Sequence, residues 1–224
     1  MSTFAVVPVK NLLKSKLRLS VLLNNTERQT LTLAMLEDVL GALRFSMVCR
    51  TIVISSDSTV HRFAENFGIE ALQENGQGLN QAVDQATQWC IQKGAKSVLT
   101  LPVDIPLITS DDINHIINLG HEETSIVISP SRNGGTNALL QRPPNLIPPC
   151  FGPDSFKEHL NQALTMGIQP KIYRSPRVSL DIDSERDIEN FLKIGKHNTS
   201  YQLLSKISKS TLKTADAYSH KPSP

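Results

Sequence analysis

The sequence predicts an α/β domain of three layers, because short apolar segments alternate with helical stretches along the chain. These segments are rich in Val, Ile and Leu rather than alternating with polar residues, which indicates strands buried on both faces. They span residues 4–9, 50–56, 96–102, 125–130 and 136–141. Strands that alternate with helices in this way are typical of a sheet covered by helices on both sides.

The longest predicted helix spans residues 26–45, where Leu36, Val39 and Leu40 recur at helical spacing and Thr26 can serve as the N-cap. The other predicted elements lie at regular intervals. They are a helix over residues 79–93, a helix capped by Thr109 or Ser110, a helix over 152–164, a strand over 171–174 and a helix starting near Ser184.

The chain divides into two parts by composition. Residues 1–196 form one predicted domain, since a chain of 224 residues can bury one sizeable core. Residues 197–224 are rich in Ser, Lys and Thr, and we expect a polar tail there with one helical turn near Leu203.

The overall charge excludes some partners. A formal charge of +2, from 23 basic and 21 acidic side chains, gives no chain-wide reason to expect nucleic acid or an anionic membrane.

Cys49, Cys90 and Cys150 are too scattered for a disulfide framework, so we expect buried thiols in a reducing compartment. No apolar segment approaches the roughly 18 residues of a membrane span. We expect a cytoplasmic protein.

The loop after the first strand concentrates positive charge. Residues 6–19, VVPVKNLLKSKLRL, place Lys10, Lys14, Lys16 and Arg18 where an open α/β sheet usually binds its ligands. Such spaced cations suit a triphosphate, although a solvated basic turn has the same composition. The loop contains no glycine and no GxxxxGK[ST] motif, which excludes a P-loop.

Three aspartates are candidate metal ligands. Asp104 follows a buried strand between Pro102 and Pro106, which fix the backbone around it. Asp181 and Asp183 point to the same side of an extended segment, and a cation between them would relieve their repulsion. Asp104 with Asp183 could hold Mg²⁺ together with substrate phosphates. A tight turn at Asp104 and a helix cap at Asp183 are the structural alternatives.

Two glycine-containing segments indicate small-anion sites. Thr136 and Asn137 follow paired glycines, and Gly152 and Ser155 lie at a predicted helix start, where free N–H groups attract anions. A hairpin turn and a capped helix are the alternatives. Gly78 and Asn80 open another helix and fit either a nucleoside contact or an ordinary loop.

The histidines show no catalytic or metal-ligand spacing. His61, His115, His121 and His159 are scattered, and we expect surface or helix positions for them. No Ser-His-Asp or Cys-His arrangement is apparent.

Taken in order, several segments resemble the 2-phospho-L-lactate guanylyltransferase family, which makes a precursor of the deazaflavin coenzyme. The resemblance covers about residues 4–194 and rests on PVKNLLKSKLRLS, TERQTLTLAMLEDVLGAL, GLNQAV, LPVDIPL, GGTNALL, FGPDSFKEHL and LDIDSERDI. It implies a nucleotide-diphospho-sugar-transferase-like, Rossmann-like fold, with a mixed but mostly parallel sheet. Asn133 and Ser184 depart from the family's usual Asp and Thr.

The resemblance also implies roles for individual residues. Lys10, Lys16 and Arg18 would lie along the triphosphate of GTP, with Gly78 and Asn80 near the nucleoside. Asp104, which is also a catalytic candidate, Asp183 and Asp181 would match the Mg²⁺ ligands. Thr136, Gly152 and Ser155 would hold a phosphorylated three-carbon acid.

The reaction implied is transfer of GMP from GTP to the phosphate of 2-phospho-L-lactate or a related acid, with release of pyrophosphate. The family also suggests a homodimer, with residues 141–151 as a contact surface. Two alternatives stay open. One is another GTP- or CTP-dependent nucleotidyltransferase acting on a sugar phosphate or molybdopterin, and the other is a non-catalytic nucleotide-binding protein.

Overall fold

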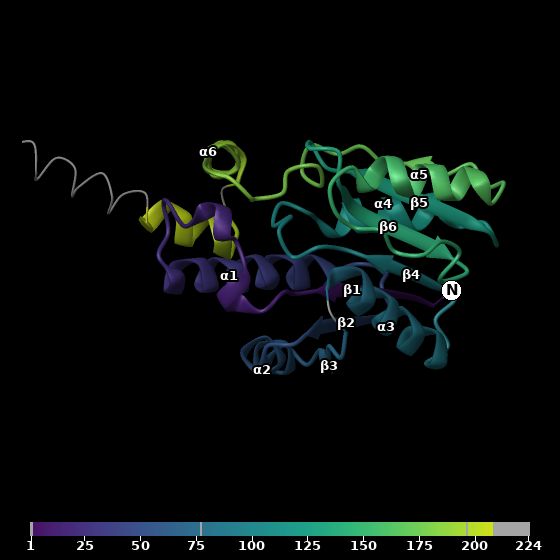
Figure 1. Ribbon diagram of the computed structural model, residues 1–224, viewed down its shortest axis with the longest axis horizontal. Coiled ribbons are helices and arrows are strands. Elements are labelled where there is room, and N and C mark those ends of the chain that lie inside the picture. The colour runs from purple at the N-terminus through teal and green to yellow at the C-terminus, as the bar shows by residue number, and fades with distance from the viewer. Residues whose placement is uncertain (1, 77, 196, 208–224) are drawn as a thin grey trace, which may run out of the picture.

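The computed structural model describes residues 2–76, 78–195 and 197–207, which form one seven-stranded sheet with helices on both faces (Figure 1). The strand order is β3-β2-β1-β4-β6-β5-β7. Only β6 runs antiparallel to its neighbours, so the predicted mixed, mostly parallel sheet is confirmed. The strands are β1 (Thr3–Pro8), β2 (Arg50–Ser55), β3 (Glu70–Gln73), β4 (Ser97–Thr100), β5 (Ser125–Pro130), β6 (Thr136–Arg142) and β7 (Lys171–Ile172).

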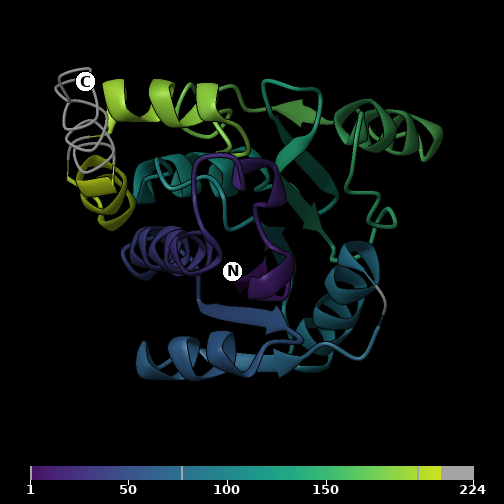
Figure 2. The same cartoon turned by 60° about the vertical axis from the view of Figure 1, so that its left-hand side comes forward.

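The helices form the two outer layers. Helices α3 and α5 cover one face of the sheet, while the others cover the opposite face together with the chain at residues 199–207 (Figure 2). The helices are α1 (Asn25–Arg44), α2 (Ser58–Asn66), α3 (Leu79–Gln92), α4 (Ser110–Leu119), α5 (Ser155–Thr165) and α6 (Glu185–Ile194). Two 3-10 turns, η1 (Leu12–Lys14) and η2 (Leu17–Leu19), follow β1.

Alternation along the strands explains why consecutive residues in them are apolar. On β1, Phe4 and Val6 pack in the cluster that includes α3, while Ala5 and Val7 pack in the cluster that includes α1. Successive side chains of a strand point to opposite faces, so a sheet covered on both sides needs apolar residues at every position.

The topology places several loops at one edge of the sheet. β1 and β4 run parallel and end there, at Pro8 and Thr100. β6 runs antiparallel to β4, so its first residue, Thr136, lies at this same edge. The backbone N–H of Ile182 donates to the carbonyl of Asp104 (3.0 Å), which brings the segment before α6 to the same place.

Three local expectations were wrong or incomplete. Helix α1 begins one residue before Thr26, because Asn24 accepts from the Glu27 N–H and the Glu27 carboxylate closes a capping box. The strand expected over residues 171–174 is limited to β7. α2 and β3 were not predicted, since β3 is a short edge strand that is partly exposed and lacks an apolar run.

The chain beyond α6 packs against the domain. Residues 199–207 are helical, which is longer than the single turn expected near Leu203. Asp38 of α1 accepts from the N–H groups of Thr199 (2.8 Å) and Ser200 (3.0 Å), and Leu204 is buried in the main core. Residues 208–224 of the predicted tail lie outside the described residues.

The cysteines differ in burial. Cys90 is buried and Cys150 is half-buried, but Cys49 is exposed, which corrects the expectation of three buried thiols. Burial raises the pKa of Cys90 to about 12, so this thiol stays protonated and serves the core.

Candidate active site

A cavity of about 560 Å³ opens at the edge of the sheet where β1 and β4 end. Segments far apart in the sequence meet there, as expected outside the carboxyl ends of an open α/β sheet. The predicted site residues that line it are Lys10, Lys16, Arg18, Asp104, Thr136, Gly152, Ser155, Asp181 and Asp183.

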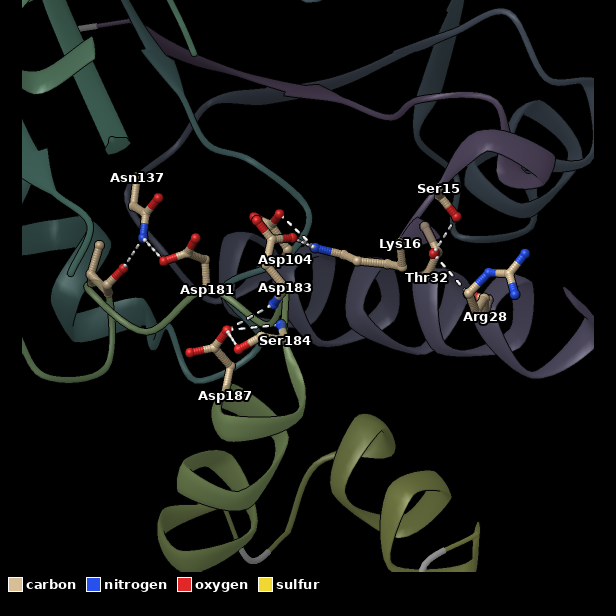
Figure 3. A network of polar contacts seen from close by, with 11 residues as sticks. Ser15, Lys16, Arg28, Thr32, Asp104, Asn137, Asp181, Asp183, Ser184 and Asp187 are labelled. Atoms are coloured by element: carbon tan, nitrogen blue, oxygen red, sulfur yellow. Dashed lines mark hydrogen bonds and ion pairs between the residues drawn. The ribbon is translucent and has the colours of Figure 1, made fainter. Parts of the chain in front are cut away.

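The Lys16 side chain points its ammonium group at two of the predicted metal ligands, Asp104 and Asp183 (Figure 3). Its ammonium group donates to Asp104 Oδ2 and to Asp183 Oδ1, each at 2.7 Å. The Lys16 side chain is only 6% exposed, and its backbone adopts a left-handed conformation with φ 51°. A non-glycine residue rarely takes this conformation, so the structure holds Lys16 in place at some conformational cost.

The charges in this cluster depend on one another. Burial lowers the pKa of Lys16, but attraction from Asp104 and Asp183 outweighs burial and raises it overall. Burial opposes ionisation of Asp183, yet the attraction of Lys16 lowers the pKa of that carboxyl. Burial, and then repulsion from Asp104, raise the pKa of Asp181. The cluster therefore carries an excess of negative charge that one ammonium group does not balance.

We call the three aspartates Asp104, Asp181 and Asp183 the acidic floor, and two of them, Asp104 and Asp183, are close enough to share one cation. Asp104 and Asp183 converge on a single positive charge, and carboxylate oxygens are the ligands that Mg²⁺ prefers. Within the described residues, no three acidic, His or Cys side chains are already arranged as a complete metal site. A cation there would need oxygen ligands from a substrate, as Mg²⁺ commonly does in nucleotide sites.

The other cations of the loop form a basic wall, defined here as Lys10, Lys14 and Arg18. All three are exposed and line the cavity. None of them forms an ion pair in the part of the chain that the structure describes. The backbone beneath them is nevertheless fixed, because the Leu12 N–H donates to Asp57 (3.0 Å).

A second group of lining residues forms what we call the acceptor wall, defined as Thr136, Gly152 and Ser155. Thr136 is 5% exposed and Ser155 is 1% exposed, and the Ser155 hydroxyl donates to Thr136 Oγ1 at 3.3 Å. Gly152 has φ 152°, within the region that favours glycine. The Phe156 N–H donates to the Gly134 carbonyl (3.1 Å), which ties the start of α5 to the start of β6.

Two predicted nucleotide-binding residues lie beside the cavity rather than among its lining residues. Gly78 is the N-cap of α3 with φ 108°. The Asn80 side chain accepts from the Phe151 N–H (2.7 Å) and donates to the Phe151 carbonyl (3.1 Å). Asn80 therefore positions the segment next to Gly152, and a nucleoside contact by either residue stays a prediction.

Two features of the site were missed at the sequence level. His159, expected at the surface or on a helix, lies on α5 but is fully buried behind Thr136. Asp112, in the first turn of α4, accepts two hydrogen bonds of 2.8 and 2.9 Å from Arg177. It also accepts from Tyr173 (2.7 Å), so it anchors the segment that leads to Asp181. No sequence spacing connects these partners.

Comparison with solved structures establishes the fold. A nucleotide-diphospho-sugar transferase from Desulfovibrio desulfuricans G20 superposes with a TM-score of 0.78 at 17% identity, over 93% of this chain and 96% of that one. A nucleotidyl transferase from Methanothermobacter gives 0.65 at 14% identity, over 85% and 95%. The chain has the fold of nucleotide-diphospho-sugar transferases.

Sequence comparison identifies the family. The model of the family described as "Guanylyl transferase CofC like" matches residues 3–219. The chain is 41% identical over 189 residues to a phosphoenolpyruvate guanylyltransferase of Rubrobacter xylanophilus, covering 84% of this chain and 92% of that protein. It is 36% identical over 208 residues to a 2-phospho-L-lactate guanylyltransferase of Methanothermobacter thermautotrophicus, covering 92% of both. The chain belongs to the CofC-like guanylyl transferase family and is a nucleotidyltransferase.

None of the helices within the described ranges is both long enough and apolar enough to cross a membrane.

Proposed function

We propose that this chain transfers GMP from GTP to the phosphate of 2-phospho-L-lactate, or of a closely related phosphorylated three-carbon acid, and releases pyrophosphate. The observation that carries the proposal is the single cavity that joins the basic wall, the acidic floor and the acceptor wall. Its volume of about 560 Å³ lies in the range of roughly 300–1,000 Å³ that is usual for ligand pockets.

The reaction needs no protein nucleophile. An oxygen of the acceptor phosphate attacks the α-phosphorus of GTP, and the bond to the leaving pyrophosphate breaks. The phosphomonoester, with a second pKa of about 6, is largely dianionic at pH 7. The residues must therefore align two polyanions and offset the repulsion between them.

The basic wall and Lys16 supply positive charge for the triphosphate. Lys10 and Arg18 can reach phosphate oxygens from the exposed loop, one as a point charge and the other as a fork. The Lys16 ammonium has three N–H donors, of which two serve Asp104 and Asp183. Its third donor is left for a phosphate oxygen in the cavity.

We assign Mg²⁺ to Asp104 and Asp183, with Asp181 assisting. The bound ion would neutralise phosphate charge and favour departure of pyrophosphate. Asp183 keeps a lowered pKa and is therefore ionised at neutral pH, as a metal ligand must be. The Asn137 side chain donates to Asp181 (3.3 Å) and so orients that carboxylate.

The acceptor wall suits a small acid with two anionic groups. Thr136 and Ser155 offer hydroxyl groups, and Gly152 lets a ligand approach the backbone closely. The similarity to relatives named for phosphoenolpyruvate and for 2-phospho-L-lactate supports both acids as candidates. The same similarity supports a role in deazaflavin coenzyme biosynthesis.

We also propose a cytoplasmic homodimer. Residues 141–151 are the candidate contact surface, where Pro143, Asn145 and Pro148 are exposed. Ile147 of this segment is buried within its own chain, so the contact would use the exposed Pro143 and Pro148. Light scattering of the purified protein measures the assembly directly, and a monomer at all concentrations would contradict the dimer.

Pyrophosphate release tests the proposed reaction. Purified protein with Mg²⁺ is assayed with GTP, CTP or ATP against 2-phospho-L-lactate, phosphoenolpyruvate, 3-phosphoglycerate and a sugar phosphate. We expect release with GTP and one of the two 2-phosphorylated acids. Release with CTP and the sugar phosphate alone would favour a different nucleotidyltransferase, and no release with any pair would favour a binding protein.

A further inference from the structure

His159 lies directly behind the acceptor wall. It belongs to the second turn of α5, is 0% exposed and contacts the Phe151 ring edge to face at 5.0 Å. Its Nδ1 lies 2.9 Å from Thr136 Oγ1, and its Nε2 lies 3.2 Å from the Cys150 backbone nitrogen. The imidazole thus bridges the first residue of β6 and the loop that carries Gly152.

These two contacts determine the tautomer of the ring. A backbone N–H can only donate, so Nε2 accepts from Cys150 and carries no proton. The neutral ring must then be protonated at Nδ1, which donates to Thr136. Burial lowers the pKa of His159 to about 4, against the weaker opposing effect of a hydrogen bond between the ring and the Ser155 backbone, which agrees with a neutral ring.

The tautomer in turn orients the Thr136 hydroxyl. Thr136 Oγ1 accepts from His159 at 2.9 Å and from the Ser155 hydroxyl at 3.3 Å, which occupies both of its lone pairs. Its own proton is left without a partner in this cluster. Because Thr136 lines the cavity, this proton can be directed at an anionic oxygen there.

We propose that His159 is a positioning residue, which acts through Thr136 to present a fixed hydroxyl donor to an oxyanion of the phosphorylated acid. The inference rests on the proposed function, since it takes the acceptor wall to be the acid-binding side. It assigns His159 no proton transfer and no contact with substrate. Because the His159 ring donates to Thr136, the Thr136 hydroxyl cannot donate its own proton to that ring. The proton therefore remains available to the ligand.

Two substitutions at His159 separate this role from simple support of the loop. His159→Asn places an amide N–H near the Nδ1 position and keeps the donor to Thr136, whereas His159→Gln keeps an acceptor for Cys150 but loses that donor. In His159→Gln we expect the KM for the acid to rise about fivefold to tenfold, the effect of one lost hydrogen bond. The KM for GTP should not change in either variant. In His159→Asn, the KM for the acid should stay within about twofold of the wild-type value.

A double substitution tests the route through Thr136. Thr136→Val alone should raise the KM for the acid, and adding His159→Gln should raise it no further, because the donor has already lost its target. Additive effects, a loss confined to His159→Asn, or equal increases for acid and GTP would overturn the proposal. The acid used is the one that wild type consumes in the pyrophosphate assay.

Nitrogen NMR of the histidine ring keeps the inference testable if wild type consumes none of the acids or a variant does not fold. In unmodified protein, one ring should be neutral with its proton on Nδ1 across about pH 5.5 to 8, and this signal should disappear in His159→Gln. A protonated Nε2, or a ring that titrates near the ordinary value of about 6.5, would overturn the proposal. An inactive wild type with the expected tautomer would instead reject the proposed reaction.

Discussion

The two sides of the cavity are built in opposite ways. The basic wall consists of exposed cations that have no ion-pair partner among the described residues, while Thr136 and Ser155 of the acceptor wall are buried and hydrogen-bonded. Long exposed side chains lose conformational entropy when they bind a ligand, whereas side chains that are already held in a preformed pocket lose little. We infer that the basic wall supplies charge for a polyanion and the acceptor wall supplies shape selection for a small acid.

The acidic floor joins the two sides, and its loss should have the largest effect. Asp104→Asn and Asp183→Asn should each lower kcat by about a hundredfold to a thousandfold, because each removes a charge assigned to the metal at the reacting phosphates. Steady-state kinetics under saturating Mg²⁺ measure this effect. Circular dichroism should show the native fold.

Asp84→Asn is the matched control, because Asp84 is an exposed carboxylate on α3 away from the acidic floor. We expect it to keep wild-type turnover. Near-normal activity of either Asp104→Asn or Asp183→Asn would contradict the metal assignment and remove the link between the two sides.

The next largest effect concerns stability. Burial alone would raise the pKa of Asp112, but hydrogen bonds from Arg177 and then Tyr173 outweigh it and hold the pKa well below its usual range. Asp112 is 0% exposed and its carboxylate accepts from Arg177 and Tyr173, so Asp112→Asn weakens several charge-assisted hydrogen bonds at a buried position and should cost about 3 kcal/mol of unfolding free energy. Urea denaturation at pH 7 measures this cost.

The pH dependence of that cost has a definite sign. A carboxyl with a lowered native pKa stabilises the fold fully above its unfolded pKa of about 3.9, and the contribution is lost as the pH falls below it. The difference between wild type and Asp112→Asn should therefore shrink from pH 5 to pH 3. Asp111→Asn, its exposed neighbour, should show little difference at any pH. A difference that stays constant would refute the ionic role of Asp112.

Much of the fold was predictable because burial on both faces leaves a direct mark in the sequence. Every residue of the strands β1, β4, β5 and β6 is buried, and each strand contains an uninterrupted group of apolar residues. Helix α3 agrees with the expected bounds within one residue. β3 was missed because an edge strand with exposed ends needs no such run. The Asp57 cap and apolar spacing of α2 could have revealed that helix.

The site was predictable at the level of residue types and not of their partners. Chemistry and resemblance could predict that Asp104 and Asp183 lie close together. The contact of Lys16 with both carboxylates depends on a left-handed backbone at Lys16, which no local pattern indicates. The burial of His159 depends on how α5 packs on β6, which is a tertiary property. Sequence patterns report which side chains are available, while packing decides which of them meet.

Charge removal at the basic wall should affect GTP more than the acid. Arg18→Ala should raise the KM for GTP about tenfold by removing a charge-assisted contact, and the effect should diminish at high salt because the wall is exposed. Steady-state kinetics at two salt concentrations measure both the rise in the KM for GTP and its dependence on salt. Lys14→Ala serves as the control, since we expect this side chain to stay solvated. An equal increase in the KM for the acid would mean that the two sides are not distinct.

The smallest predicted effect lies on the acceptor wall and tests its preformed character. Ser155→Ala removes a hydroxyl that donates to Thr136 and lines the cavity, so the KM for the acid should rise about fivefold while the KM for GTP changes less. Because Ser155 is buried, this ratio should not depend on salt, in contrast to Arg18→Ala. Equal effects on both substrates, or a salt-dependent ratio, would place Ser155 outside the acid pocket and leave shape selection to Thr136 and Gly152.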